Sequence, residues 1–175
     1  MHTMIEKCRI LYKGDKLAGS FYLLVSSFLL ISSIGLYLFT TSLGYFYLAI
    51  GLFLFSVYAA GKGIFIMHQA SRRLQFFQSK ELLIPTELQE EINYTQYRID
   101  KKVRNRTRYT RAVILSSIIA FVGLFTSEKG LISGSAIPVA FISGLEMGIG
   151  MLTEFRLREY LRILKKHQQE EIPVN

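Results

Sequence analysis

Two ionisable residues of opposite charge, Lys62 and Glu146, interrupt otherwise apolar stretches of this 175-residue sequence. Each precedes an arginine by ten positions, Arg72 and Arg156 respectively. On helices, both would therefore lie about 15 Å from the same boundary. Charges inside apolar helices are costly and commonly mark an ion pair, a passage or a water-filled lumen. The matched spacing predicts a Lys62–Glu146 ion pair, formed within one chain or between neighbouring chains.

Glycines accompany both charges. Gly61 and Gly63 flank Lys62, and Gly144 and Gly148 bracket Glu146 in G-x-x-x-G spacing. Small residues let helix backbones approach closely. We expect these four glycines to pack helices together, either inside the chain or between copies in a homo-oligomer.

The sequence offers little for catalysis or metal binding. It has no nucleotide-binding, zinc-protease or serine-hydrolase motif, and its three histidines are far apart with only Cys8 to join them. We therefore assign no catalytic residue, no metal site and no cofactor. Arg162 and His167 have the R-x4-H spacing of HEPN-type ribonucleases, which leaves a membrane-bound nuclease as a minor alternative.

A basic cluster lies before the third apolar stretch. Its members are Arg98, Lys101, Lys102, Arg104, Arg106, Arg108 and Arg111. Such clusters beside a membrane usually bind anionic lipid headgroups, each charge contributing about 1 kcal/mol. An acidic cytosolic protein is the second candidate partner. Nucleic acid is a third, because Tyr94, Tyr97 and Tyr109 interleave with the cluster, but no nucleic-acid-binding motif accompanies them.

Four apolar segments must position these residues: about 17–40, 45–68, 111–126 and 131–153. A helix needs about 20 apolar residues to cross the hydrocarbon core of a bilayer, and the third segment is the shortest. We predict an all-α polytopic membrane protein in which four transmembrane helices form two hairpins with cytoplasmic helical extensions. The two halves share this layout, which suggests an architectural repeat.

The distribution of basic residues predicts the orientation. All but Lys62 and Lys129 of the 21 Lys and Arg residues fall in segments on one side of the predicted spans, and cytoplasmic flanks retain positive charge. We therefore expect both termini in the cytoplasm, in the plasma (inner) membrane of a bacterium. The predicted segments are a basic N-terminal segment 1–16, hairpin 17–68, a basic helical segment 69–110, hairpin 111–153 and an amphipathic tail 154–175.

Helical patterns recur in the cytoplasmic segments. Pro85 should end one helix, and Thr86 with its following residues predicts the start of another that continues into the third span. The acidic residues Glu87, Glu90 and Glu91 on this helix are expected to face water. In the tail, Phe155, Leu157, Leu161 and Leu164 recur at helical spacing and predict an apolar face.

These patterns favour a non-enzymatic, oligomeric inner-membrane subunit that anchors or signals to a cytosolic partner through its basic central segment and tail. A pore or ion-leak protein, carried by Lys62 and Glu146, is the main alternative. The layout resembles that of small multi-span subunits of bacterial phage-defence systems, although no motif is shared.

Overall fold

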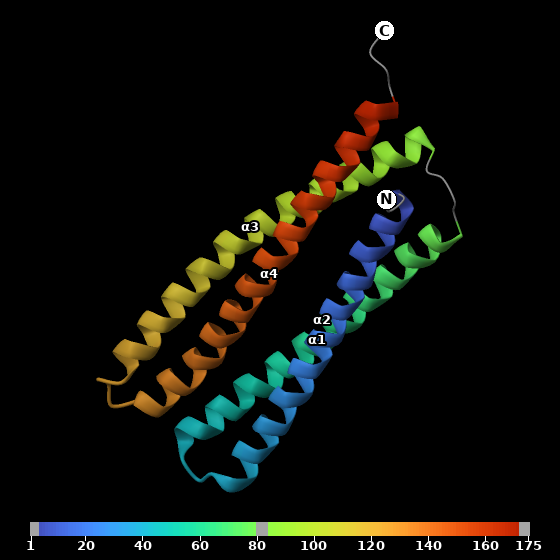
Figure 1. The fold of residues 1–175 in the computed structure, drawn as a ribbon. Coiled ribbons are helices and arrows are strands. Elements are labelled where there is room, and N and C mark those ends of the chain that lie inside the picture. The colour runs from blue at the N-terminus through green and yellow to red at the C-terminus, as the bar shows by residue number, and fades with distance from the viewer. Residues whose placement is uncertain (1–3, 80–83, 172–175) are drawn as a thin grey trace.

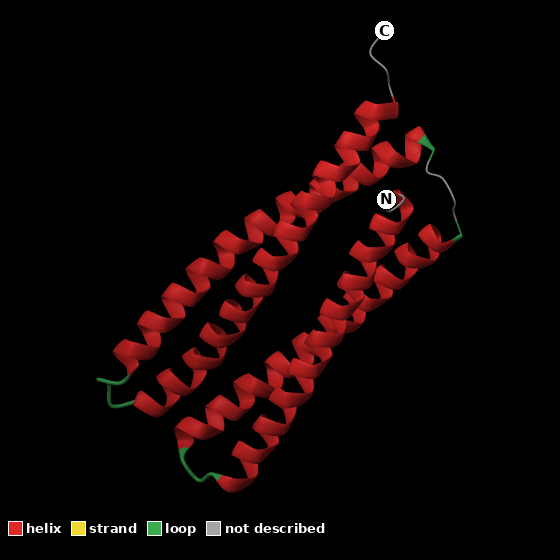
Figure 2. Cartoon of the chain, viewed as in Figure 1, coloured by secondary structure: helices red, strands yellow, loops and turns green. Residues whose placement is uncertain are grey.

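The computed structural model describes residues 4–79 and 84–171, which form four long α-helices. Helix α1 spans Met4–Phe39, α2 Leu43–Gln78, α3 Pro85–Gly123 and α4 Lys129–Glu171. Consecutive helices are antiparallel, so the start of α1, the end of α2, the start of α3 and the end of α4 lie at one end of the bundle (Figure 1). The described part of the chain contains no strand (Figure 2). The predicted all-α architecture is confirmed, but the predicted segment boundaries fall inside continuous helices.

The helices pair as two hairpins, α1 with α2 and α3 with α4, and α2 contacts α4 between them. Glycines permit the closest approaches. A Cβ atom added to Gly63 of α2 would lie 2.9 Å from the carbonyl oxygen of Gly19 in α1, and one added to Gly134 of α4 would collide with the carbonyl of Gly44 in α2. Larger side chains at these positions would force the helices apart.

Helix α3 begins at Pro85, one position earlier than Thr86. Proline suits the first helical turn because its missing N–H would have no partner there. The Glu87 carboxylate accepts a hydrogen bond from the Ile84 N–H at 3.3 Å, which satisfies one backbone donor at the helix start. The helix then continues without a break to Gly123, as predicted. The preceding helix was predicted to run to Pro85, but α2 ends at Gln78 and Ile84 is not helical; residues 80–83 lie outside the described residues.

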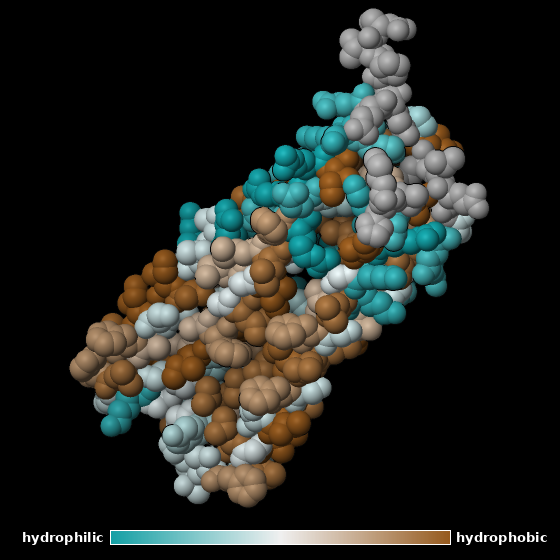
Figure 3. Space-filling model, viewed as in Figure 1, coloured by the Kyte–Doolittle hydropathy of each residue, from teal (hydrophilic) through white to brown (hydrophobic). Residues whose placement is uncertain are grey.

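The bundle divides along its length into two regions. We call residues 17–68 and 111–153 the apolar half, and residues 4–16, 69–79, 84–110 and 154–171 the polar half. The surface changes from mostly brown to mostly teal between them (Figure 3). Many large apolar side chains of the apolar half point outward, such as Leu24, Phe65 and Phe121, each more than 60% exposed. Water would penalise such a surface, whereas lipid favours it.

Three helices, α1, α2 and α4, are long and apolar enough to cross a membrane. Helix α3 does not meet this criterion, although four spans were predicted. Its charge-free stretch begins only at Ala112, because Arg108 and Arg111 immediately precede it, and the helix ends at Gly123. The apolar part of α3 is therefore shorter than a standard span.

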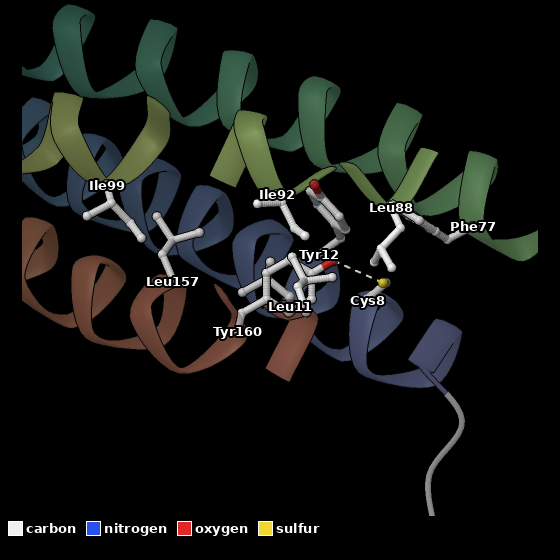
Figure 4. Close-up of a cluster of buried hydrophobic side chains, with 10 residues drawn as sticks. Cys8, Leu11, Tyr12, Phe77, Leu88, Ile92, Ile99, Leu157 and Tyr160 are labelled. Atoms are coloured by element: carbon white, nitrogen blue, oxygen red, sulfur yellow. Dashed lines mark hydrogen bonds between the residues drawn. The ribbon is translucent and has the colours of Figure 1, made fainter. Parts of the chain in front are cut away.

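The polar half has a packed interior to which all four helices contribute. Ten buried residues form one cluster (Figure 4): Cys8, Leu11, Tyr12, Phe77, Leu88, Ile92, Ile99, Leu157, Tyr160 and Leu164. Such packing of large side chains inward is typical of a helix bundle in water. The predicted tail face is confirmed at Leu157 and Leu164, but Phe155 is 69% exposed and does not join it.

Candidate functional site

Lys62 and Glu146 form an ion pair within one chain, joining α2 to α4. Lys62 Nζ donates a hydrogen bond to Glu146 Oε2. The Glu146 side chain is only 3% exposed and that of Lys62 is 21% exposed. Removing either partner would leave a charge in surroundings that solvate it poorly. The pair thus connects the two hairpins where the apolar half approaches the polar half.

Two tyrosines surround the ammonium group of Lys62. Its Nζ lies 4.8 Å from the ring centroid of Tyr22 and 5.6 Å from that of Tyr58, within cation–π range. The Tyr22 hydroxyl and Glu146 Oε1 are buried and have no hydrogen-bond partner among the described residues. Buried polar atoms are normally paired. This site therefore retains unused hydrogen-bonding capacity.

A small cavity of about 20 Å³ adjoins the ion pair and is large enough for one water molecule. Its lining includes Lys62, Glu146, Lys102, Asn105 and Tyr109. Burial, together with the nearby Lys62 charge, lowers the pKa of Lys102 below its ordinary value. The neighbourhood of the ion pair therefore holds a second lysine whose charge is unfavourable there.

Two arginines of the basic cluster make ion pairs with buried carboxylates of other helices. Arg98 Nη2 lies 2.6 Å from Asp15 Oδ2 of α1, and Arg106 Nη1 lies 3.1 Å from Glu154 Oε2 of α4. Burial disfavours the Arg98 charge, but the Asp15 carboxylate outweighs that effect and raises the pKa of Arg98. These arginines connect helices and are not available as a free basic surface.

A third buried carboxylate, Glu91, lies among tyrosines in the polar half. Tyr12 Oη donates to Glu91 Oε1 at 2.6 Å, Tyr160 Oη donates to the same atom at 3.1 Å, and Arg73 Nη1 lies 3.5 Å from Oε2. Glu91 is 2% exposed. The prediction that it faces water is wrong, because Glu91 shares the inward face of α3 with Leu88 and Ile92.

The same network encloses Cys8. Burial, and to a lesser extent the Glu91 charge, raises the pKa of the Cys8 thiol to about 11, although the Tyr160 hydroxyl, whose one proton is shared between Cys8 Sγ at 2.9 Å and Glu91, opposes the shift. Burial first and the Glu91 charge second also raise the pKa values of Tyr12 and Tyr160. All three groups are therefore protonated at neutral pH, and the thiol is unreactive.

The remaining basic residues of the cluster face outward. Lys101, Arg104, Arg108 and Arg111 are exposed, and their spacings of three and four positions place them on one face of α3. Lys102 is half-buried and lines cavities inside the bundle. The cluster that appears continuous in sequence is thus divided between the interior and the surface.

Of the four glycines near the ion pair, only Gly63 packs against another helix in the chain, where it meets Gly19 and Leu23. A Cβ atom added to Gly61, Gly144 or Gly148 would meet nothing within 4 Å. Within one chain these three do not serve helix packing, because no neighbouring helix covers them. Their role between copies stays a prediction.

An open groove of about 550 Å³ lies between α3 and α4 in the polar half. Ile99 and Leu161 supply apolar lining, and Arg158, Arg162 and Lys165 supply exposed positive charge. Arg162 lies in this groove, whereas His167 does not line it. Five positions separate the two residues, which places them on different sides of the helix.

Sequence reasoning missed three buried carboxylates: Asp15, Glu91 and Glu154. A signal was present, since Asp15 follows Leu11 by four positions, Glu91 follows Leu88 by three, and Glu154 precedes Leu157 by three. Those intervals place each acid on the apolar face of its helix. An acid on such a face predicts a buried partner.

No group of three or more His, Cys, Asp or Glu residues that could hold a metal ion occurs in the described ranges. Comparisons of the chain with protein-family models, with curated proteins and with solved structures found no match.

Proposed function

We propose that the chain is a four-span membrane protein. The loop between α3 and α4 is short, so the end of α3 must lie on the same side of the membrane as the start of α4. Because α4 is long and apolar enough to cross, α3 must cross as well. Outward-facing apolar side chains such as Ile118, Phe121 and Val122 support this crossing. Arg108 and Arg111 would extend toward the headgroups and compensate for the short stretch.

The orientation follows from charge. The polar half carries most of the basic residues, and cytoplasmic flanks retain positive charge. The start of α1, the end of α4 and the adjoining ends of α2 and α3 lie at this same end (Figure 1). We place the polar half in the cytoplasm of a bacterial cell and the two short loops outside.

The function that we infer is non-enzymatic: the polar half holds, or signals to, a cytosolic protein that presents an acidic amphipathic helix. The groove between α3 and α4 carries this proposal, because Arg158, Arg162 and Lys165 surround apolar lining from Ile99 and Leu161. An amphipathic helix binds such a groove through its apolar face. Acidic flanks on the helix would complement the basic rim and accelerate association.

The residues on the outward basic face of α3 lie at different distances from the membrane and therefore suit different partners. Arg108 and Arg111 lie within about one helical turn of the apolar stretch, at the level of lipid headgroups. Lys101 and Arg104 lie about 10–15 Å from Arg111 along the helix axis, beyond that level. Anionic lipids therefore suit the first two residues, and the cytosolic partner suits the groove above them.

Capture of cytosolic proteins on the full-length protein in uncharged nanodiscs tests this function. Arg162→Glu with Lys165→Glu should release a partner that the wild type retains, and added salt should weaken the wild-type complex. Lys13→Glu with Lys16→Glu is the matched control, because these exposed α1 residues make the same charge change away from the groove. Identical captured proteins for both variants, or no protein at all, would overturn the proposal.

A pore formed by several copies is the second candidate. The open faces of Gly61, Gly144 and Gly148 favour contact between copies, and that contact would bring neighbouring Lys62–Glu146 pairs closer together. Vesicle conductance of wild type and Glu146→Gln tests it. Equal conductance, or none in either protein, would exclude a pore carried by this pair.

A further inference from the structure

A second cavity, of about 250 Å³ and partly open to the surface, lies between the helices next to the Lys62–Glu146 pair. All four helices line it, including Tyr22 of α1, Lys62 of α2, Lys102 of α3 and Thr153 of α4. Lys62, Lys102 and Asn105 line both this cavity and the smaller one, so the two spaces adjoin. The larger space can hold several water molecules but is slightly below the usual volume of a site for a drug-sized ligand.

The lining carries an excess of positive charge. Lys62 is paired with Glu146 and Arg98 with Asp15, which neutralises those four groups. Lys101 and Lys102 also line the cavity, and neither makes an ion pair or hydrogen bond with any described residue. Burial and the Lys62 charge lower the pKa of Lys102, so a nearby anion would relieve an existing cost.

A second observation also points to a ligand. The Tyr22 side chain lines the cavity, the residue is 1% exposed, and its hydroxyl makes no hydrogen bond of standard geometry with a described residue, although the Glu146 carboxylate is an electrostatic neighbour. A buried hydroxyl without a partner loses the free energy of a hydrogen bond to water. An oxyanion in the cavity would accept a hydrogen bond from Tyr22 and face the ammonium group of Lys102, with the exposed Lys101 at the rim.

We propose that this cavity binds a phosphate group. The volume fits a phosphate with a few waters; the Tyr22 phenol can donate a hydrogen bond to it, and the ammonium groups of Lys102 and of Lys101 at the rim supply positive charge. The cavity lies where the apolar and polar halves meet, so the phosphate can belong to a lipid headgroup or to a soluble ion or ester. This site is separate from the groove between α3 and α4, and its existence does not depend on the proposed partner.

Thermal unfolding of the delipidated full chain in uncharged detergent tests the soluble source. Inorganic phosphate should raise the unfolding temperature more than chloride at equal ionic strength. Lys102→Gln and Tyr22→Phe should each weaken phosphate binding about ten-fold, the loss expected for one hydrogen bond to a charged group. Arg104→Gln removes the same charge from the outer face of α3 and should bind phosphate as the wild type does.

Nanodiscs of phosphatidylcholine with and without phosphatidic acid test the lipid source. If the headgroup is the ligand, phosphatidic acid should be retained by the wild type and by Arg104→Gln during purification, and lost from Lys102→Gln and Tyr22→Phe. Without phosphate, Lys102→Gln should be at least as stable as the wild type, because Lys102 has no partner to lose. The proposal would be overturned if wild type and Lys102→Gln responded equally to inorganic phosphate and to phosphatidic acid. It would also be overturned if Lys102→Gln were already unfolded in the absence of ligand.

Discussion

The four helices pack differently in the polar half and in the apolar half of the bundle. In the polar half, ten buried residues from all four helices form one cluster that includes Tyr12, Phe77 and Leu157. In the apolar half, the corresponding cluster contains only Val25, Leu29 and Ile142, and α3 contributes nothing to it. Large apolar side chains point inward at one end and outward at the other.

Small residues and hydroxyl groups hold the apolar half together instead. Ser26 and Ser56 each donate to the other's backbone carbonyl, at 2.9 and 3.0 Å, and Ser33 donates to the Ala49 carbonyl at 2.8 Å. In lipid, burying apolar surface between helices gains little, so close backbone approach and hydrogen bonds replace it. The comparison indicates that the two halves are adapted to two solvents.

Breaking the Glu91 network should have the largest effect. Glu91→Ala leaves the Tyr12 hydroxyl and the Arg73 guanidinium without their acceptor and leaves the Tyr160 hydroxyl with Cys8 Sγ alone, and should lower the free energy of unfolding by about 4 kcal/mol. A denaturant titration in detergent, followed by circular dichroism, measures it. Glu90→Ala, one position earlier and exposed, is the control. Similar values for the two variants would show that the network does not stabilise the polar half.

Two leucines on α4 sharpen the contrast between the halves. Leu157 is fully buried in the polar half, whereas Leu152 is 70% exposed in the apolar half. Leu157→Ala should cost about 3 kcal/mol through lost burial and a cavity, and Leu152→Ala less than about 0.5 kcal/mol. The same titration compares them. A larger loss of unfolding free energy for Leu152→Ala would show that Leu152 is buried against a neighbouring helix.

The Lys62–Glu146 pair should have an intermediate effect. Glu146→Gln leaves the Lys62 ammonium poorly compensated and should cost about 2 kcal/mol, since Lys62 is partly exposed and retains some solvation. Lys62→Met should cost a similar amount, and the double variant less than the two combined. Additive losses in this double-mutant cycle would show that the pair is not coupled.

The smallest predicted effect is a pH dependence that arises from Cys8. The unfolded thiol ionises near its ordinary pKa of 9.0, whereas the folded thiol stays protonated up to about 11. Above pH 9 the unfolded state therefore binds fewer protons, and stability falls as the pH rises. Between pH 9 and 10 the wild type should lose about 1 kcal/mol more than Cys8→Ala. Parallel stability curves for the two proteins would contradict the assigned burial.

The sequence was sufficient for the all-α hairpin layout, because apolar stretches and charge blocks report the two solvents directly. Equal spacing from Arg72 and Arg156 also indicated that Lys62 and Glu146 lie at one depth. The division of the basic cluster could not be read in the same way. Arg98 and Arg106 are ion-paired because Asp15 and Glu154, distant in sequence, lie within reach of their long side chains, and only the arrangement of α1 and α4 around α3 brings those acids there.

The groove and the 250 Å³ cavity were equally beyond the sequence, since each depends on the relative rotation of neighbouring helices. Lys101 and Lys102 are adjacent in the chain, yet one is exposed and the other half-buried. A helical pattern assigns faces to residues but does not say which neighbouring helix covers each face.

The central claim, that all four helices cross the membrane with the polar half inside the cell, has one direct test. In a Cys8→Ala background, single cysteines are introduced at Thr41, Ser127 and Asn93, all exposed. A maleimide that cannot cross membranes is then applied to intact and to lysed cells. We predict labelling of Thr41→Cys and Ser127→Cys in intact cells, and of Asn93→Cys only after lysis. Protection of Ser127→Cys until lysis would show that α3 does not cross and would contradict the account.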